Sequence, residues 1–195
     1  FSNDIAKDIV KKRGQASMIF ARNVLVHVAN LHDFTEGMHT ALADDGVLAV
    51  EVHYAKIILE GLHYDSIYHE HLCYFTLKSI EKLMGGHDFY VFDVIASPIS
   101  GGAMIVYARK KKTEPSEKVY EYRNQEKESK TNEFASWQEF ATRSLAHKEK
   151  LLGMLGEIKK KLLGILGDKK MRVVGWGSSA RSSTMLNFCG IDSHM

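Results

Sequence analysis

The segment YDSIYHEHLCYFT, residues 64–76, gathers three tyrosines, two histidines, a glutamate and a cysteine on what reads as a connection between a strand and a helix. An imidazole, with an ordinary pKa of about 6.5, exchanges protons near neutral pH, and an adjacent carboxylate can orient it. His69, Glu70 and His71 therefore form a candidate general-base site, flanked by aromatic side chains that can exclude water. The alternative is a structural role, in which these side chains hold the loop through hydrogen bonds to the backbone.

His27, in NVLVHV, is a second candidate, because it follows the short apolar run 16–21. Such a run is typical of a buried parallel strand. His27 then lies outside the carboxyl end of that strand, where α/β sheets place their ligands.

Seven of the ten histidines fall between positions 27 and 71, which raises the question of a metal site. No spacing among them matches the usual zinc patterns, so we predict no metal site in these residues. Solvated side chains are the more common state of isolated histidines. We therefore expect exposure for His32, His39, His53 and His63.

Four runs rich in apolar and β-branched residues must form the scaffold for these candidates. They lie near 16–21, 47–52, 88–96 and 102–109. The intervening helical patterns predict a right-handed parallel crossover between the first two strands. The turn-rich SPISGG predicts that the last two strands pair antiparallel, and we expect all four in one sheet. The fold class is therefore α/β.

The chain changes character after about residue 110. Residues 110–133 are highly charged and poor in apolar residues, which predicts a solvated connector, and residues 134–165 follow the pattern of one long amphipathic helix. A strand, a Gly175-Gly177-Ala180 turn and a helix start come next. We divide the chain into 1–112, 113–168 and 169–195, and we expect the strand at 171–175 to stay outside the first sheet.

Composition limits the partners and the compartment. Lys and Arg number 26 against 24 Asp and Glu, so a net charge of +2 predicts neither nucleic-acid nor membrane-surface binding. Two separate cysteines fit a reducing cytoplasm, and no apolar run approaches the ~20 residues of a membrane helix. Because the chain begins at Phe1, we expect a piece of a longer protein.

Four motifs, in this order, carry a family resemblance: ARNVLVHVANLHDF, YDSIYHEHLCYF, GGAMIVYARK and VVGWGSSARSSTMLNFCGI. They resemble the S-adenosylmethionine-dependent C-methyltransferases that act on nucleotide-linked 4-keto-6-deoxysugars. The resemblance implies the second half of a class I methyltransferase-like Rossmann sheet, a long linker helix and the start of a Rossmann-like C-terminal domain. The cofactor's glycine loop and a zinc-binding region would both come earlier in the chain, so zinc is not expected here.

The same resemblance implies roles for the candidate residues. Methylating a carbon next to a ketone requires removal of a weakly acidic proton and in-line attack on a sulfonium methyl group. Tyr68 and His71 are the candidates for the base, and His71 is preferred because its ordinary pKa is nearer neutrality. Glu70 would orient the base or bind a sugar hydroxyl, and His27 would face the substrate from the other strand end.

Arg22 and Asn23, at the end of the first expected strand, would line the cofactor side. Two alternatives remain open at this stage. The turn GWGSSA alone would suit an NAD-linked Rossmann oxidoreductase. The chain would also suit a non-catalytic sugar-nucleotide-binding or scaffold fragment, since the cofactor loop is not among its residues. The identity of the sugar, the methylated carbon and the oligomeric state do not follow from the sequence.

Overall fold

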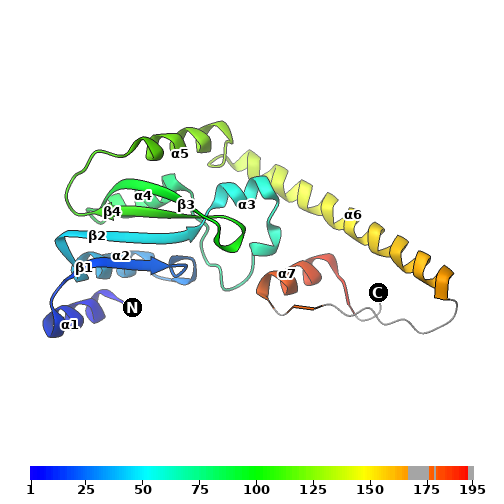
Figure 1. Cartoon of the computed structure of the whole chain (residues 1–195), viewed down its shortest axis with the longest axis horizontal. Coiled ribbons are helices and arrows are strands. Elements are labelled where there is room, and N and C mark those ends of the chain that lie inside the picture. The colour runs from blue at the N-terminus through cyan, green and yellow to red at the C-terminus, as the bar shows by residue number, and fades with distance from the viewer. Residues whose placement is uncertain (167–175, 178, 193–195) are drawn as a thin grey trace.

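A mixed four-stranded sheet forms the core of the N-terminal half in the computed structural model, which describes residues 1–166, 176–177 and 179–192 (Figure 1). Its strands lie in the order β1 (Ala16–Arg22), β2 (Leu42–His53), β4 (Ala103–Arg109) and β3 (Tyr90–Ser97). β1 and β2 are parallel, whereas β4 is antiparallel to both β2 and β3. The predicted α/β class and the shared sheet with its antiparallel pair are confirmed.

β2 is longer than predicted. The sequence Asp44-Asp45-Gly46 reads as a turn, yet it lies inside this strand. The register with β1 jumps from the pair Ala16–Leu42 to the pair Met18–Val47, so the extra residues form a bulge rather than a loop. From Val50 to its end, β2 is buried on both faces, as expected of a central strand.

Helices and short 3₁₀ turns connect and cover the strands. Ser2 caps the first helix by accepting the N–H of Ile5, and Thr76 caps α4 by accepting the N–H of Ser79. The fully buried Ile80 fixes α4 on the core. The elements of this half are α1 (Asn3–Arg13), η1 (Leu25–His27), α2 (Leu31–Ala41), α3 (Ala55–Gly61), η2 (Tyr64–Ser66), α4 (Leu77–Gly85) and η3 (Ile99–Gly101).

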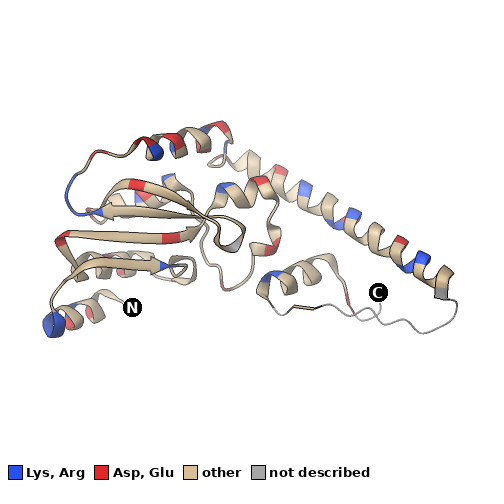
Figure 2. Ribbon diagram, in the orientation of Figure 1, with Lys and Arg blue, Asp and Glu red and all other residues tan. Residues whose placement is uncertain are grey.

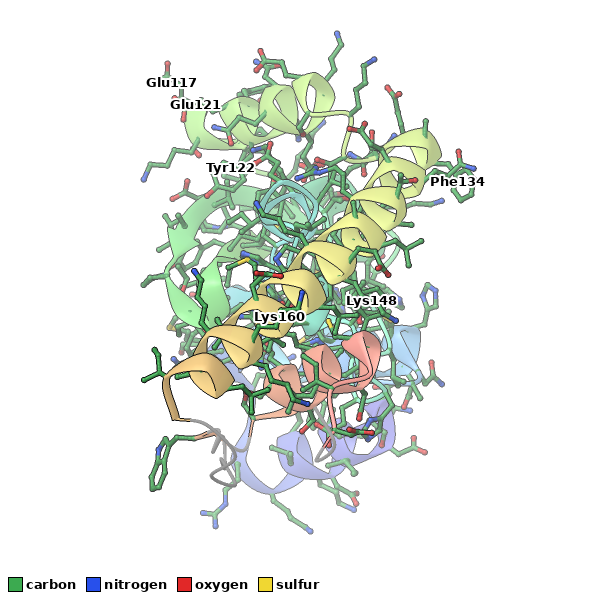
Figure 3. The ribbon with its side chains drawn as sticks, turned by 90° about the vertical axis from the view of Figure 1, so that its right-hand side faces the viewer. Glu117, Glu121, Tyr122, Phe134, Lys148 and Lys160 are labelled. Carbon is green, nitrogen blue, oxygen red and sulfur yellow. The ribbon has the colours of Figure 1, made fainter. Side chains whose placement is uncertain are left out.

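The prediction of a solvated connector at 110–133 is wrong, because this stretch contains the helix α5 (Glu117–Glu128), which packs on the sheet. Its Val119 is fully buried, and Tyr122, on the side of α5 that faces the sheet, stacks on Tyr54 with ring centroids 5.5 Å apart (Figure 3). The buried carboxylate of Glu126 accepts backbone N–H groups at the start of α4. A few inward residues thus dock a helix whose composition is otherwise polar.

α6 (Phe134–Leu166) is the single long helix that the periodicity predicts, and it carries charges along much of its length (Figure 2). Phe140 packs near its start against Ile58 of α3. α7 (Ala180–Cys189) lies beside α6 and η2, whereas the strand expected at 171–175 lies outside the described residues. Within the described ranges, none of the helices combines the length and hydropathy that a bilayer-spanning segment needs.

Candidate active site

The candidate site lies where the chain leaves the carboxyl ends of β1 and β2. α3 and α7 lie at the same end of the sheet (Figure 1). η1 follows β1 and carries His27, and the segment 62–76 follows β2 and α3. The carbonyl of the buried Val26 accepts the N–H of Leu72 at 2.8 Å and that of Cys73 at 3.4 Å. These two hydrogen bonds fasten the two loops together, although their residues lie more than forty positions apart in sequence.

Tyr68 and His71 form the central hydrogen-bonded pair of the site. The Tyr68 hydroxyl lies 2.7 Å from Nε2 of His71, and Nδ1 of His71 lies 3.0 Å from the carbonyl oxygen of Ser66. Because a carbonyl oxygen only accepts, Nδ1 must carry the proton. In the neutral ring Nε2 is then the acceptor, and the Tyr68 hydroxyl donates to it.

His27 joins this pair from the other loop. Its Nδ1 donates to the backbone carbonyl of Glu70 at 2.8 Å, and its ring centroid lies 5.1 Å from that of His71. Glu70 therefore contributes its main chain, while its side chain is exposed, as is that of His27. The structure thus brings His27, Tyr68, Glu70 and His71 together at an open edge, with Tyr68 and His71 half-buried.

The surroundings push the two pKa values of the central pair apart. Burial lowers the pKa of His71, the Ser66 carbonyl and Glu70 oppose this, and a charge on His27 lowers the pKa further. Burial raises the pKa of Tyr68, and the carboxylate of Glu70 adds to the rise, against a smaller lowering by Arg181. At neutral pH the imidazole is consequently neutral and the phenol protonated, so a proton donor faces an unprotonated acceptor.

Arg22 and Asn23 lie at the end of β1, where both contact the buried Glu51. The Arg22 Nε is 2.9 Å from a Glu51 carboxylate oxygen, and the Asn23 N–H donates to the Glu51 carbonyl at 2.9 Å. The hydroxyl of Ser97 donates to the other carboxylate oxygen at 2.6 Å. The Arg22 side chain is nevertheless 58% exposed, which leaves room for a ligand beside it. Its role on the cofactor side stays a prediction.

The remaining histidines behave differently from one another, and His39 and His63 are half-buried rather than exposed as expected. His32 is exposed, as expected, and its Nδ1 lies 2.9 Å from Nε2 of His87. The expectation is wrong for His53, which is only 3% exposed because it ends the central strand β2, opposite Ala103 of β4. Among the described residues, no group of three or more His, Cys, Asp or Glu side chains is arranged to hold a metal ion.

Sequence reasoning missed three residues that shape the site: Asp65, Ser66 and Arg181. Ser66 acts through its carbonyl, which no side-chain pattern reveals. Arg181 pairs with Asp65, 116 positions away, with Nε–Oδ2 and Nη2–Oδ1 distances of 2.7 and 3.0 Å. The glycine turn that precedes Arg181 could have drawn attention to it, but nothing in the sequence links it to Asp65. Of that turn, Gly175 lies outside the described residues, so the NAD-linked alternative stays untested.

Comparison with known proteins finds two family models that match successive parts of the chain. Residues 1–94 match a methyltransferase domain model, and residues 98–195 match the model of the C-methyltransferase C-terminal domain. The chain is also 32% identical, over 108 residues, to the C-methyltransferase NovU of Streptomyces niveus. That match covers 55% of this chain but spans only 26% of NovU. Since the C-terminal-domain model alone covers half of the chain, the chain belongs to the C-methyltransferase family that this domain defines.

Proposed function

We propose that this chain carries the proton-handling part of an S-adenosylmethionine-dependent C-methyltransferase, which methylates the carbon next to the ketone of a nucleotide-linked deoxysugar. The observation that carries the proposal is the Tyr68–His71 pair, with its short hydrogen bond and its unprotonated Nε2. Removing a proton from carbon requires an acceptor that is unprotonated at working pH and already positioned. Membership of the C-methyltransferase family supports methyl transfer to carbon as the reaction class.

In the proposed reaction, Tyr68 faces the substrate and His71 lies behind it. The Tyr68 oxygen takes the proton from the carbon next to the ketone while its own proton passes to Nε2 of His71. The electron pair of the broken C–H bond moves into the enolate, and His71 becomes an imidazolium stabilised by the Ser66 carbonyl. His27, whose Nδ1 is held by Glu70, presents Nε2 as an acceptor for a sugar hydroxyl.

S-adenosylmethionine, when bound, supplies an electrophilic methyl group on its sulfonium sulfur. Arg22 is the described residue that best fits this cofactor, because it offers a partly exposed guanidinium at the end of β1. A guanidinium suits a carboxylate such as that of the methionine moiety. Glu51 fixes the guanidinium through Nε, and Asn23 turns the chain away from the strand with a φ of 49°. We propose these two residues for the cofactor side of the site.

The test uses the full-length protein that contains this chain, a panel of nucleotide-linked 4-keto-6-deoxyhexoses and S-adenosylmethionine. We expect mass spectrometry to show a methylated sugar nucleotide together with S-adenosylhomocysteine. In deuterium oxide, the Tyr68→Phe variant should exchange the substrate proton next to the ketone more slowly than the unmodified protein, by a factor of roughly 10² or more. The reason is that the variant lacks the hydroxyl oxygen that takes up this proton.

Tyr120→Phe is the matched control, since Tyr120 lies on α5 and is 47% exposed. It removes the same hydroxyl from a surface position and should leave the exchange rate unchanged. The proposal is wrong if the unmodified protein methylates none of the sugar nucleotides, or if both tyrosine variants exchange at the same rate.

A further inference from the structure

The ion pair between Arg181 and Asp65 joins the start of α7 to the turn η2. It has two parallel N–H···O contacts, 2.7 and 3.0 Å long, and the two side chains are only 32% and 27% exposed. This fork-like geometry fixes the orientation of both groups, which a single lysine contact would not do. The residues belong to different matched regions, since Asp65 falls in the methyltransferase domain and Arg181 in the C-methyltransferase C-terminal domain.

Tyr64, the neighbour of Asp65, is anchored by the same part of the chain. Its side chain is 8% exposed, and its ring lies 4.9 Å from that of Phe188 in α7. Its hydroxyl lies 3.0 Å from Nδ1 of His147 in α6 and 3.9 Å from the sulfur of Cys189. Lys148, which Figure 3 shows near the end of α7, lies over the Phe188 ring at 5.5 Å. Two consecutive residues of η2 are thus held by α6 and α7.

Ser66, the last residue of this turn, provides the link to the chemistry. Its carbonyl accepts Nδ1–H of His71 at 3.0 Å and the hydroxyl of Tyr74 at 3.4 Å. The first of these bonds decides which nitrogen of His71 carries the proton and therefore which nitrogen can accept from Tyr68. A shift of the turn would change both the ring orientation and the tautomer.

We propose that Arg181 is a positioning residue for the Tyr68–His71 pair: by holding Asp65, it fixes the Ser66 carbonyl that orients the imidazole of His71. The expected effect on kcat rests on the proposed function, whereas the expected effect on the orientation and tautomer of His71 does not. The proposal also assigns a role to Ser179 and Arg181 at the end of the segment GWGSSAR. Ser179 caps α7 by accepting the N–H of Ser182, and this places Arg181 in the first turn of the helix, beside the site loop.

The charge of Arg181 supports the Tyr68–His71 pair in addition to the ion pair with Asp65. It lowers the pKa of Tyr68 against the larger rise caused by burial and by Glu70. The other groups that face the Tyr68 phenol are His71, through its hydrogen bond, and Tyr74, which contacts the same loop. A neutral residue at position 181 would therefore leave Tyr68 a weaker acid as well as a less well-oriented one.

The experiment replaces Arg181 by Met, which keeps much of the side-chain length without the charge, and by Lys, which keeps the charge without the fork. Arg123→Met is the matched control, because Arg123 pairs with Glu81 through contacts of 2.6 and 3.1 Å at a similar exposure, on α5. In the full-length protein with a nucleotide-linked 4-keto-6-deoxyhexose, we expect Arg181→Met to lower kcat roughly 10- to 100-fold with KM little changed. Arg181→Lys should restore part of this loss, and Arg123→Met should retain kcat.

A second measurement does not depend on turnover. With nitrogen-15-labelled histidine, the His71 signals, assigned by their loss in His71→Asn, should report the Nδ1–H form in the unmodified protein and in Arg123→Met. In Arg181→Met they should move toward the Nε2–H form that an imidazole in water prefers.

The inference is overturned if Arg181→Met keeps the Nδ1–H signature, or if it and Arg123→Met lose the same fraction of kcat. A protein without any methyl transfer or proton exchange would instead contradict the proposed function. In that case the nitrogen-15 signals still decide the position of His71.

Discussion

Two of the histidine pairs in the described part of the molecule have almost the same ring separation but different hydrogen bonding. The rings of His27 and His71 lie 5.1 Å apart, and those of His32 and His87 lie 5.2 Å apart. The second pair is closed on itself, because Nδ1 of His32 and Nε2 of His87 are 2.9 Å apart. In the first pair each Nδ1 is bound to a backbone carbonyl instead.

This difference separates a candidate reaction centre from a surface contact. Backbone carbonyls fix the tautomer of His27 and of His71, because each Nδ1 donates to a carbonyl and leaves Nε2 of the neutral ring as an acceptor. In His71 this acceptor receives the hydroxyl of Tyr68. In the pair His32–His87, one nitrogen of each ring is used up in the mutual contact. The density of histidines along the chain is therefore a poor guide to chemistry, and the partner of each ring nitrogen is a better one.

The largest expected effect comes from removing one ring of each pair. His71→Asn keeps an N–H donor for the Ser66 carbonyl but loses the acceptor nitrogen, so turnover should fall roughly 10²–10⁴-fold. Binding of S-adenosylmethionine, measured by calorimetry, should stay nearly the same. His87→Asn makes the equivalent change in the surface pair and should leave turnover intact. Equal losses in both variants would show that the comparison between the pairs is wrong.

The sequence reveals the polar residues of the site well, because their types are unusual for a connection. The segments around His27 and His71 follow neighbouring parallel strands, so topology alone brings them together. The roles of Ser66 and Glu70 could not be predicted, since both act through main-chain carbonyls whose direction depends on the three-dimensional path of the loop. The Arg181–Asp65 contact is hidden for a similar reason, because it depends on how α7 docks.

The bounds of β1, β3 and β4 are predictable to within two residues, whereas β2 begins five residues before its predicted start. The wrong predictions for α5 and His53 have physical causes. α5 was missed because only a few of its residues, Val119 and Tyr122 among them, face the core, and hydrophobic periodicity needs more positions than that. The exposure of His53 was misjudged because a histidine at the end of a central strand is buried by its neighbours rather than by its own preference.

His53 is a buried histidine, in contrast to the two pairs above. The effect that we expect from it is on the free energy of unfolding. Neither of its ring nitrogens has a hydrogen-bond partner among the described residues, and burial lowers its pKa from 6.5 to about 4, aided by Arg181 and His63. Because this pKa is lower in the folded state, protonation favours unfolding. The stabilising contribution is complete above pH 6.5 and is lost as the pH falls toward 4, by up to roughly 3 kcal/mol.

Urea unfolding across this pH range tests the point. His53→Phe removes the titrating group at similar volume, so its stability should depend less on pH between 6.5 and 4 than that of the unmodified protein. His32→Phe, at the exposed pair, should follow the unmodified protein. If His53→Phe loses stability with acid as steeply as the unmodified protein, the burial of a neutral imidazole is not the cause.

The smallest expected effect concerns the influence of His27 on the pKa of His71. A protonated His27 lowers the pKa of His71, in addition to the larger lowering by burial and against the raising by the Ser66 carbonyl and Glu70. His27→Asn keeps an N–H donor for the Glu70 carbonyl but removes the charge. The acid limb of the kcat–pH profile, on which His71 must be neutral, should then move to higher pH, because a charge whose ring lies 5.1 Å from that of His71 no longer lowers the pKa of His71. His32→Asn should not move this limb, and added salt should reduce the shift because His27 is exposed. A limb that stays fixed in His27→Asn would mean that the two rings titrate independently, so that His27 contributes only hydrogen bonding to the site.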